Sequence, residues 1–136
     1  MASDVDVTEP RNLLPRTAAI GGVLLGLMLA AGAYGHIFAV WSMIDANRTL
    51  LLPALSLAFA SLINIALCPP LWVGEQWAVT AALIANAAAT GYLVYLLLQG
   101  VPNHPIGFFV ALVSSHVVVL GAVRAGLVWP AVRAAT

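Results

Sequence analysis

The segment from Arg16 to Met43 constrains the fold of this chain more than any other feature. From Thr17 onward the sequence is apolar and contains no Asp, Glu, Lys or Arg until Asp45. A helix rises about 1.5 Å per residue, so roughly 20 apolar residues cross the ~30 Å hydrocarbon core of a bilayer. The segment therefore predicts a membrane-spanning helix.

Small residues recur along one face of this helix. Gly22 and Gly26 form a GxxxG pair, and the same face continues through Leu29 and Ala33 to His36. Small side chains let a second helix approach closely within a membrane. We therefore expect this face to pack against protein rather than lipid, with His36 pointing inward.

The composition of the whole chain is that of a membrane domain. Of 136 residues, 62% are hydrophobic and 7% are charged, with a mean hydropathy of +1.02, far from the values of soluble domains. The five basic residues are all arginines and are balanced by five acids, so no nucleic-acid-binding surface is expected. The single Cys68 excludes an internal disulfide and a cysteine-rich metal site.

A secretory signal peptide is the alternative interpretation of the first apolar segment. Two arginines precede an apolar stretch at residues 18–30, and small residues follow at 31–33, as in such a signal. The preceding tail is also acidic, which opposes this interpretation, since it contains Asp4, Asp6 and Glu9. We therefore interpret the segment as a retained helix.

The rest of the chain predicts three further spans. Turn residues and prolines mark the breaks, at Asp45–Arg48, at Cys68-Pro69-Pro70 with an interfacial loop after it, at residues 99–105, and at Pro130. The prediction is an all-α integral membrane protein, an up-down bundle of four transmembrane helices with short loops, at about residues 17–44, 49–68, 77–98 and 106–129. The domain occupies residues 16–130, between a polar tail (1–15) and a short C-terminal tail (131–136).

Small residues also line the later spans. Ala85 and Ala89 belong to an alanine-rich face of the third span, and Ser115, Ala122 and Gly126 form a stripe on the fourth. Four short helices cannot easily use so many close-packing faces among themselves. Besides membrane lipids, we therefore expect other membrane protein subunits or further copies of this chain as partners.

The arginines predict the orientation. With four spans the two termini share one side, which then carries Arg11, Arg16, Arg124 and Arg133, and only Arg48 lies on the other. Cytoplasmic segments carry the excess of basic residues, so both termini are predicted to be cytoplasmic. The Ala-, Val- and Leu-rich, lysine-free composition is associated with GC-rich bacterial genomes, which suggests a bacterial inner (plasma) membrane.

No strong catalytic motif is present. The chain lacks HExxH, GxSxG, a cysteine pair and any carboxylate within a span. Small multidrug resistance transporters share this size and helix count, but they depend on a glutamate in the first helix that this chain lacks. No catalytic residue is predicted. No metal site is predicted either, because His36, His104 and Asp45 have no diagnostic ligand spacing.

Two histidines, His36 and His116, lie within predicted spans and are functional candidates for that reason. The favoured interpretation is that both are neutral and hydrogen-bonded to neighbouring helices, with Asn86 as the partner of His116. A second is that the pair binds a b-type haem within the bundle, despite an expected depth difference of about 6 Å. A third is a proton relay or polar ligand pocket formed by Asn64, Asn86 and His116.

The leading functional hypothesis is a non-catalytic accessory or assembly subunit of a larger membrane complex. It follows from the many small-residue faces and the scarcity of polar chemistry inside the spans. No cofactor is predicted under this hypothesis. The alternative is a cofactor- or ligand-handling membrane protein that uses His36 and His116, either a haem b electron carrier or an enzyme or carrier for a lipid-soluble small molecule.

Overall fold

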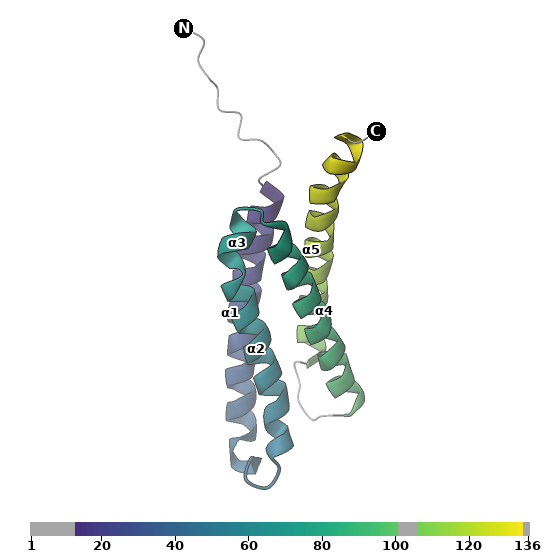
Figure 1. The fold of residues 1–136 in the computed structure, drawn as a ribbon. Helices are drawn as coiled ribbons and strands as arrows, with labels where there is room; N and C mark the ends of the chain where they lie inside the picture. The colour runs from purple at the N-terminus through teal and green to yellow at the C-terminus, as the bar shows by residue number, and fades with distance from the viewer. Residues whose placement is uncertain (1–12, 101–105, 135–136) are drawn as a thin grey trace.

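The computed structural model describes residues 13–100 and 106–134, with side chains described as far as residue 126. Four long helices dominate these ranges: α1 (Leu13–Val40), α2 (Leu52–Ala66), α4 (Gln76–Leu98) and α5 (Ile106–Ala134). They run up and down alternately in one bundle (Figure 1). Three short helices complete the described chain: η2 (Trp41–Met43), η3 (Arg48–Leu51) and α3 (Cys68–Trp72). The predicted all-α bundle is confirmed.

Four helical segments are long and apolar enough to cross a membrane: Leu13–Met43, Arg48–Ala66, Gln76–Leu98 and Ile106–Gly126. Their lengths run from 19 to 31 residues, enough to cross a bilayer core that requires about 20. Large apolar side chains are exposed on all four, among them Leu24, Phe59, Ile84 and Val118. An apolar exterior suits contact with lipid, because placing a charged side chain in the bilayer core costs free energy. The chain is a multi-pass membrane protein.

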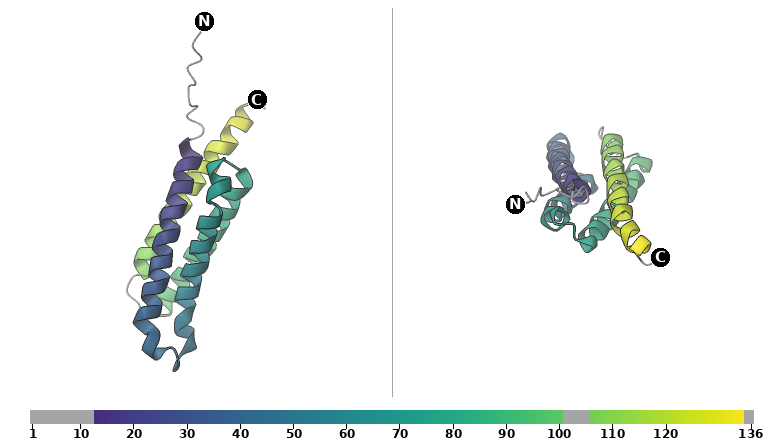
Figure 2. Two further views of the ribbon diagram at one scale, coloured as in Figure 1. Left: turned by 90° about the vertical axis from the view of Figure 1, so that its left-hand side faces the viewer. Right: turned by 90° about the horizontal axis from the view of Figure 1, so that it is seen from above.

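The bundle consists of two helical hairpins, α1–α2 and α4–α5, which stand side by side when viewed end-on (Figure 2). We call the end where α1 begins and α5 finishes the terminal end, and the end with the α1–α2 turn the hairpin end (Figure 1). A buried cluster nearer the hairpin end includes Leu29, Leu57, Leu93 and Val113. A second cluster nearer the terminal end includes Ala18, Leu71, Val79, Leu120 and Val123.

Two predicted helix boundaries were wrong, and both involve proline. Helix α1 begins at Leu13, so residues 13–15 are helical rather than part of the tail. Pro15 lies in the first turn, where its missing N–H would have no intrahelical partner. Helix α5 continues through Pro130 to Ala134 instead of ending there. A proline removes one backbone hydrogen bond, and transmembrane helices tolerate that loss.

The break at Cys68-Pro69-Pro70 is confirmed, but the segment after it is not simply a loop. The prolines occupy the first turn of the short helix α3, a position that suits them. Gly74, at φ 80°, then turns the chain toward α4. Helix α3 packs against α1, with the Arg16 guanidinium carbon 5.4 Å from the centroid of a Trp72 ring.

Candidate functional site

A layer of buried polar residues separates the two apolar clusters. On α2, α4 and α5 the polar residues Asn64, Asn86 and His116 fall, in sequence, between members of one cluster and members of the other. On α1 the corresponding position is Gly22, which is also buried. We call these four residues the polar layer.

The two asparagines bind each other. Asn64 Nδ2 donates to Asn86 Oδ1 at 3.0 Å, and Asn86 Nδ2 donates to Asn64 Oδ1 at 3.1 Å. Each amide also donates its second hydrogen to a carbonyl one turn back, Asn64 to Ala60 and Asn86 to Ala82, both at 2.8 Å. A side-chain amide has two N–H hydrogens, so both hydrogens of both side chains are used. The pair joins α2 to α4 and has no donor left over.

His116 reaches the polar layer from α5. Its side chain is 7% exposed, and Nε2 has no hydrogen-bond partner within the part of the chain that the structure describes. The ring lies against two glycines of α1. A Cβ built on Gly21 would be 3.5 Å from Nδ1, and one built on Gly22 would be 3.6 Å from Nε2. The Asn64 backbone oxygen is also 3.6 Å from that Gly22 position.

The partner predicted for His116 was therefore wrong. Asn86 bonds to Asn64 and has no free N–H for the imidazole. The prediction assumed that residues at similar depth meet, but helices α2 and α4 turn their asparagines toward each other. The structure places Asn64, Asn86 and His116 in one layer, and a ligand pocket formed by them stays a prediction.

His36 lies away from the polar layer. Its Nε2 and the Leu50 carbonyl oxygen are 2.6 Å apart, so the ring donates to the backbone of η3 at the hairpin end. His116 lies against α1 at Gly22. From Gly22 to His36 the helix α1 rises about 20 Å. Two histidines that ligate one haem must face each other across a single iron. The positions of His36 and His116 do not fit that arrangement.

The small residues singled out from the sequence divide into three groups. Gly22, Gly26 and Ala33 are buried on α1. A Cβ on Gly26 would be 2.8 Å from Ile65 Cγ1 and 3.1 Å from the Ser61 oxygen, so α2 approaches very closely there. Ala85 and Ala89 are partly buried on α4, whereas Ser115, Ala122 and Gly126 on α5 are exposed.

A second close contact of α1 was not predicted. A Cβ on Gly32 would overlap the ring of Phe109, a buried residue of α5. Gly21, which meets His116, lies three helical turns earlier on the same face. The spacing of Gly21 and Gly32 is the sequence signal that could have revealed this second face.

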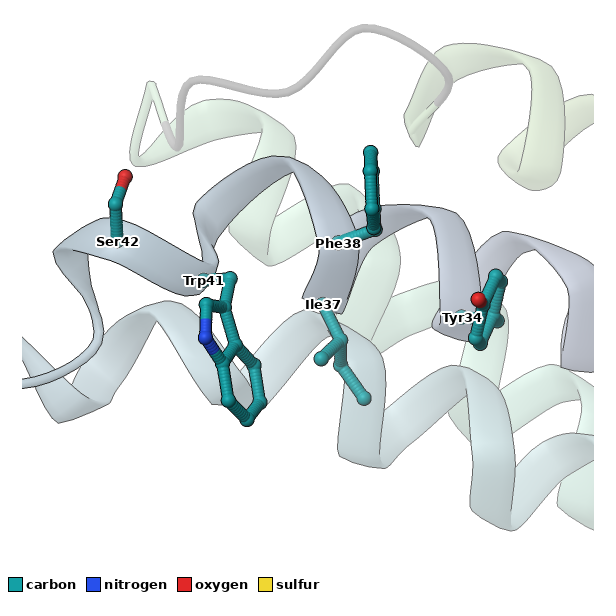
Figure 3. Close-up of a pocket in the computed structure, with 5 residues that line it drawn as sticks. All are labelled: Tyr34, Ile37, Phe38, Trp41 and Ser42. Atoms are coloured by element: carbon teal, nitrogen blue, oxygen red, sulfur yellow. The ribbon is translucent and has the colours of Figure 1, made fainter.

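Two apolar hollows on the surface are lined by described residues. One, of about 270 Å³, lies between α2 and α4 and is lined by Ser56, Phe59, Ala60, Ile63, Ala85, Ala88, Ala89 and Tyr92. The other, of about 580 Å³, is lined by Tyr34, Ile37, Phe38, Trp41 and Ser42. All five of these come from α1 and η2, as Figure 3 shows. The aromatic rings of Tyr34, Phe38 and Trp41 are strongly exposed.

Among the described residues, no group of three or more His, Cys, Asp or Glu side chains gathers at a possible metal site. His104 lies outside the described residues. Comparison with protein-family models, curated proteins and solved structures finds no match to this chain. The fold thus defines the class, a four-span membrane protein, and the function must be argued from the site and the surface.

Proposed function

We propose that this protein is a non-catalytic accessory or assembly subunit of a larger membrane complex, in a bacterial inner membrane with both termini cytoplasmic. One observation carries the proposal: a small-residue face of α5 points away from the bundle. Its members are Gly107, Ala111, Ser115 and Ala122, all exposed. Gly126 is exposed too, but a Cβ built on it would lie 3.6 Å from Leu14 of α1. Lipid tails are as apolar as leucine, so helices associate in membranes through close packing of such small residues.

Two further features support the proposal. The described lining residues of the hollow on α1 and η2 come from one helical segment, and the aromatic rings among them are exposed on the surface of the described bundle. The buried polar groups, in contrast, are largely engaged in structural bonds within the bundle, as the asparagine pair illustrates. Exposed aromatic rings on α1 and η2 and exposed small residues on α5 both suit contact with other helices.

The test is purification from native membranes in a mild detergent, with co-purifying membrane proteins identified. Ala122→Leu places a bulky side chain on the small-residue face of α5 and should abolish co-purification. Ala58→Leu makes the same change at an exposed position on α2 and is the matched control. A protein that purifies alone, or partners that Ala122→Leu retains, would contradict the proposal.

The alternative is a protein that handles a lipid-soluble small molecule. The observation in its favour is the buried Nε2 of His116, which has no partner in the described chain. The haem b version requires His36 and His116 to share one iron, which their positions oppose. We expect the purified protein to show no Soret absorption band; a band that His116→Leu abolishes would favour the alternative.

A further inference from the structure

The hollow of about 270 Å³ between α2 and α4 is a groove with one polar end. Its hydroxyl-bearing residues are Ser56, the first described lining residue on α2, and Tyr92, the last on α4. Helix α2 runs away from the hairpin end and α4 runs toward it (Figure 1), so both residues lie on the hairpin-end side of the groove. The other described lining residues have hydrocarbon side chains: Phe59, Ala60, Ile63, Ala85, Ala88 and Ala89. Most of the groove therefore presents hydrocarbon to a ligand.

The groove lies within one leaflet of the membrane. On each helix its lining residues span seven positions, 56–63 on α2 and 85–92 on α4, which is about 10 Å of helix. Its inner end adjoins the polar layer, since Ile63 precedes Asn64 and Ala85 precedes Asn86. Asn86 is the eleventh of the 23 residues of α4 and lies near the middle of that span. The groove thus extends from the membrane middle toward the hairpin end, at the depth of the acyl chains of that leaflet.

The groove is too narrow for a helix. Spread over about 10 Å of helix length, a volume of about 270 Å³ corresponds to a groove about 6 Å across. A helix with its side chains is at least about 10 Å across, whereas carbon atoms in contact lie about 4 Å apart. One extended hydrocarbon chain therefore fits the groove.

Arg48 provides a positive charge at the depth of a lipid headgroup. It is exposed in η3, which leads directly into α2, and its side chain has no ion pair or hydrogen bond with the described residues. From Arg48 to Ser56 the chain rises about 13 Å along η3 and α2. Arg48 is therefore about 23 Å from the inner end of the groove. That distance is close to the ~20–22 Å between the middle of a bilayer and the outer edge of its headgroups.

We propose that the groove binds one acyl chain of a phospholipid from the leaflet on the hairpin-end side. The terminal methyl group of the chain lies beside the polar layer, and the phosphate lies at the depth of Arg48. The chain fills the space that the small alanine side chains of α4 leave open beside α2. This site is separate from the small-residue face of α5 on which the proposed function rests, so either proposal can fail without the other.

The test is photo-cross-linking in phosphatidylglycerol vesicles that contain a trace of the same lipid with a diazirine at the end of one acyl chain. Peptide mass spectrometry identifies the labelled residues. Ile63, at the inner end of the groove, should be labelled more than Leu62 and Ile84, which are exposed to lipid outside it.

Two matched variants separate the groove from the rest of the lipid-facing surface. In Ala88→Leu the larger side chain occupies the groove, so the preferential labelling of Ile63 should be lost. Ala87→Leu makes the same change at a neighbouring position that is not among the lining residues, and it should leave the labelling unchanged. Both alanines are exposed, so both variants should fold. Arg48→Gln should weaken the labelling of Ile63, whereas Arg124→Gln at the terminal end should not.

Equal labelling of Ile63, Leu62 and Ile84 would overturn the proposal, because it would show only the general lipid shell around the protein. Labelling of Leu62 and Ile84 without Ile63 would overturn it too, since a protein segment would then cover the groove. Unchanged labelling of Ile63 in Ala88→Leu would exclude the groove as the binding site. Unchanged labelling in Arg48→Gln would disprove the position assigned to the phosphate.

Discussion

Asn64 and Asn86 form a closed pair because each amide has two hydrogens and each meets two acceptors. One acceptor lies on the opposite asparagine, and the other is a carbonyl on the same helix. Interhelical hydrogen bonds in membrane proteins contribute about 0.6 kcal/mol on average, with a maximum near 1.7 kcal/mol. A doubly bonded pair belongs near the upper end of that range, because replacing one partner leaves the other buried and unpaired.

Replacing either asparagine alone should therefore cost more than replacing both. Asn64→Leu or Asn86→Leu should each lower the free energy of unfolding by roughly 1–2 kcal/mol, since the remaining amide loses partners. The double variant should recover much of this loss. Unfolding in mixed micelles measures all four proteins. Thr17→Val is the control, because it removes a hydroxyl that is hydrogen-bonded within its own helix. Its effect on the free energy of unfolding should simply add to that of Asn64→Leu. Additivity between the two asparagines themselves would contradict the pairing.

Individual residues show what the sequence could and could not predict. A polar residue inside an apolar span stands out, so Asn64, Asn86 and His116 were recognisable as candidates. Their pairing was not recognisable, because it depends on the rotation of each helix about its axis. That rotation is set by the packing of several helices together, and the spacing of residues along one helix does not contain it.

Helix α1 is the central element of the bundle because it presents small residues on two faces. Gly22 and Gly26 face α2, where they lie close to the backbone of Asn64 and Ser61. Gly21 and Gly32 face α5, where they meet the rings of His116 and Phe109. The GxxxG pattern predicted the first face. On the second face the two glycines lie three helical turns apart, a spacing that the GxxxG pattern does not include.

The contact of Gly32 with Phe109 predicts a position-specific effect of alanine. In Gly32→Ala the new methyl group would overlap three atoms of a buried ring, which must move as a unit. Overpacking of this kind costs typically about 1–3 kcal/mol. Gly35→Ala meets no atom within 4 Å and is the matched control. We expect a lower melting temperature in detergent for Gly32→Ala and little change for Gly35→Ala. Phe109→Leu should restore part of the loss, and equal melting temperatures for the two alanine variants would contradict the contact.

The architecture of the whole molecule was predictable because its cause is local. Each span reveals itself by length and by the absence of charge, without knowledge of any other span. The ends of the spans were harder to predict, since Pro15 and Pro130 lie within helices and the prolines of α3 begin one. Proline costs little in the first turn of a helix, as at Pro15 and in α3, and α5 tolerates the loss of one backbone hydrogen bond at Pro130.

Orientation in the membrane belongs to the whole molecule and provides the last prediction. Among the described arginines, Arg16 on α1 and Arg124 on α5 lie toward the terminal end, where Arg124 bonds to Thr80 near the start of α4. Arg48 lies at the hairpin end. Basic residues favour the cytoplasmic side, so the terminal end should be cytoplasmic.

Reporter fusions after Gly74 and after Thr136 should both report the cytoplasm, and a fusion after His104 should report the opposite side. Exchanging Arg16 and Arg124 for glutamine while adding two arginines beside Arg48 should weaken or invert this pattern. A Gly74 fusion that reports the outside in the wild-type chain would disprove the assigned orientation, whatever the other fusions show.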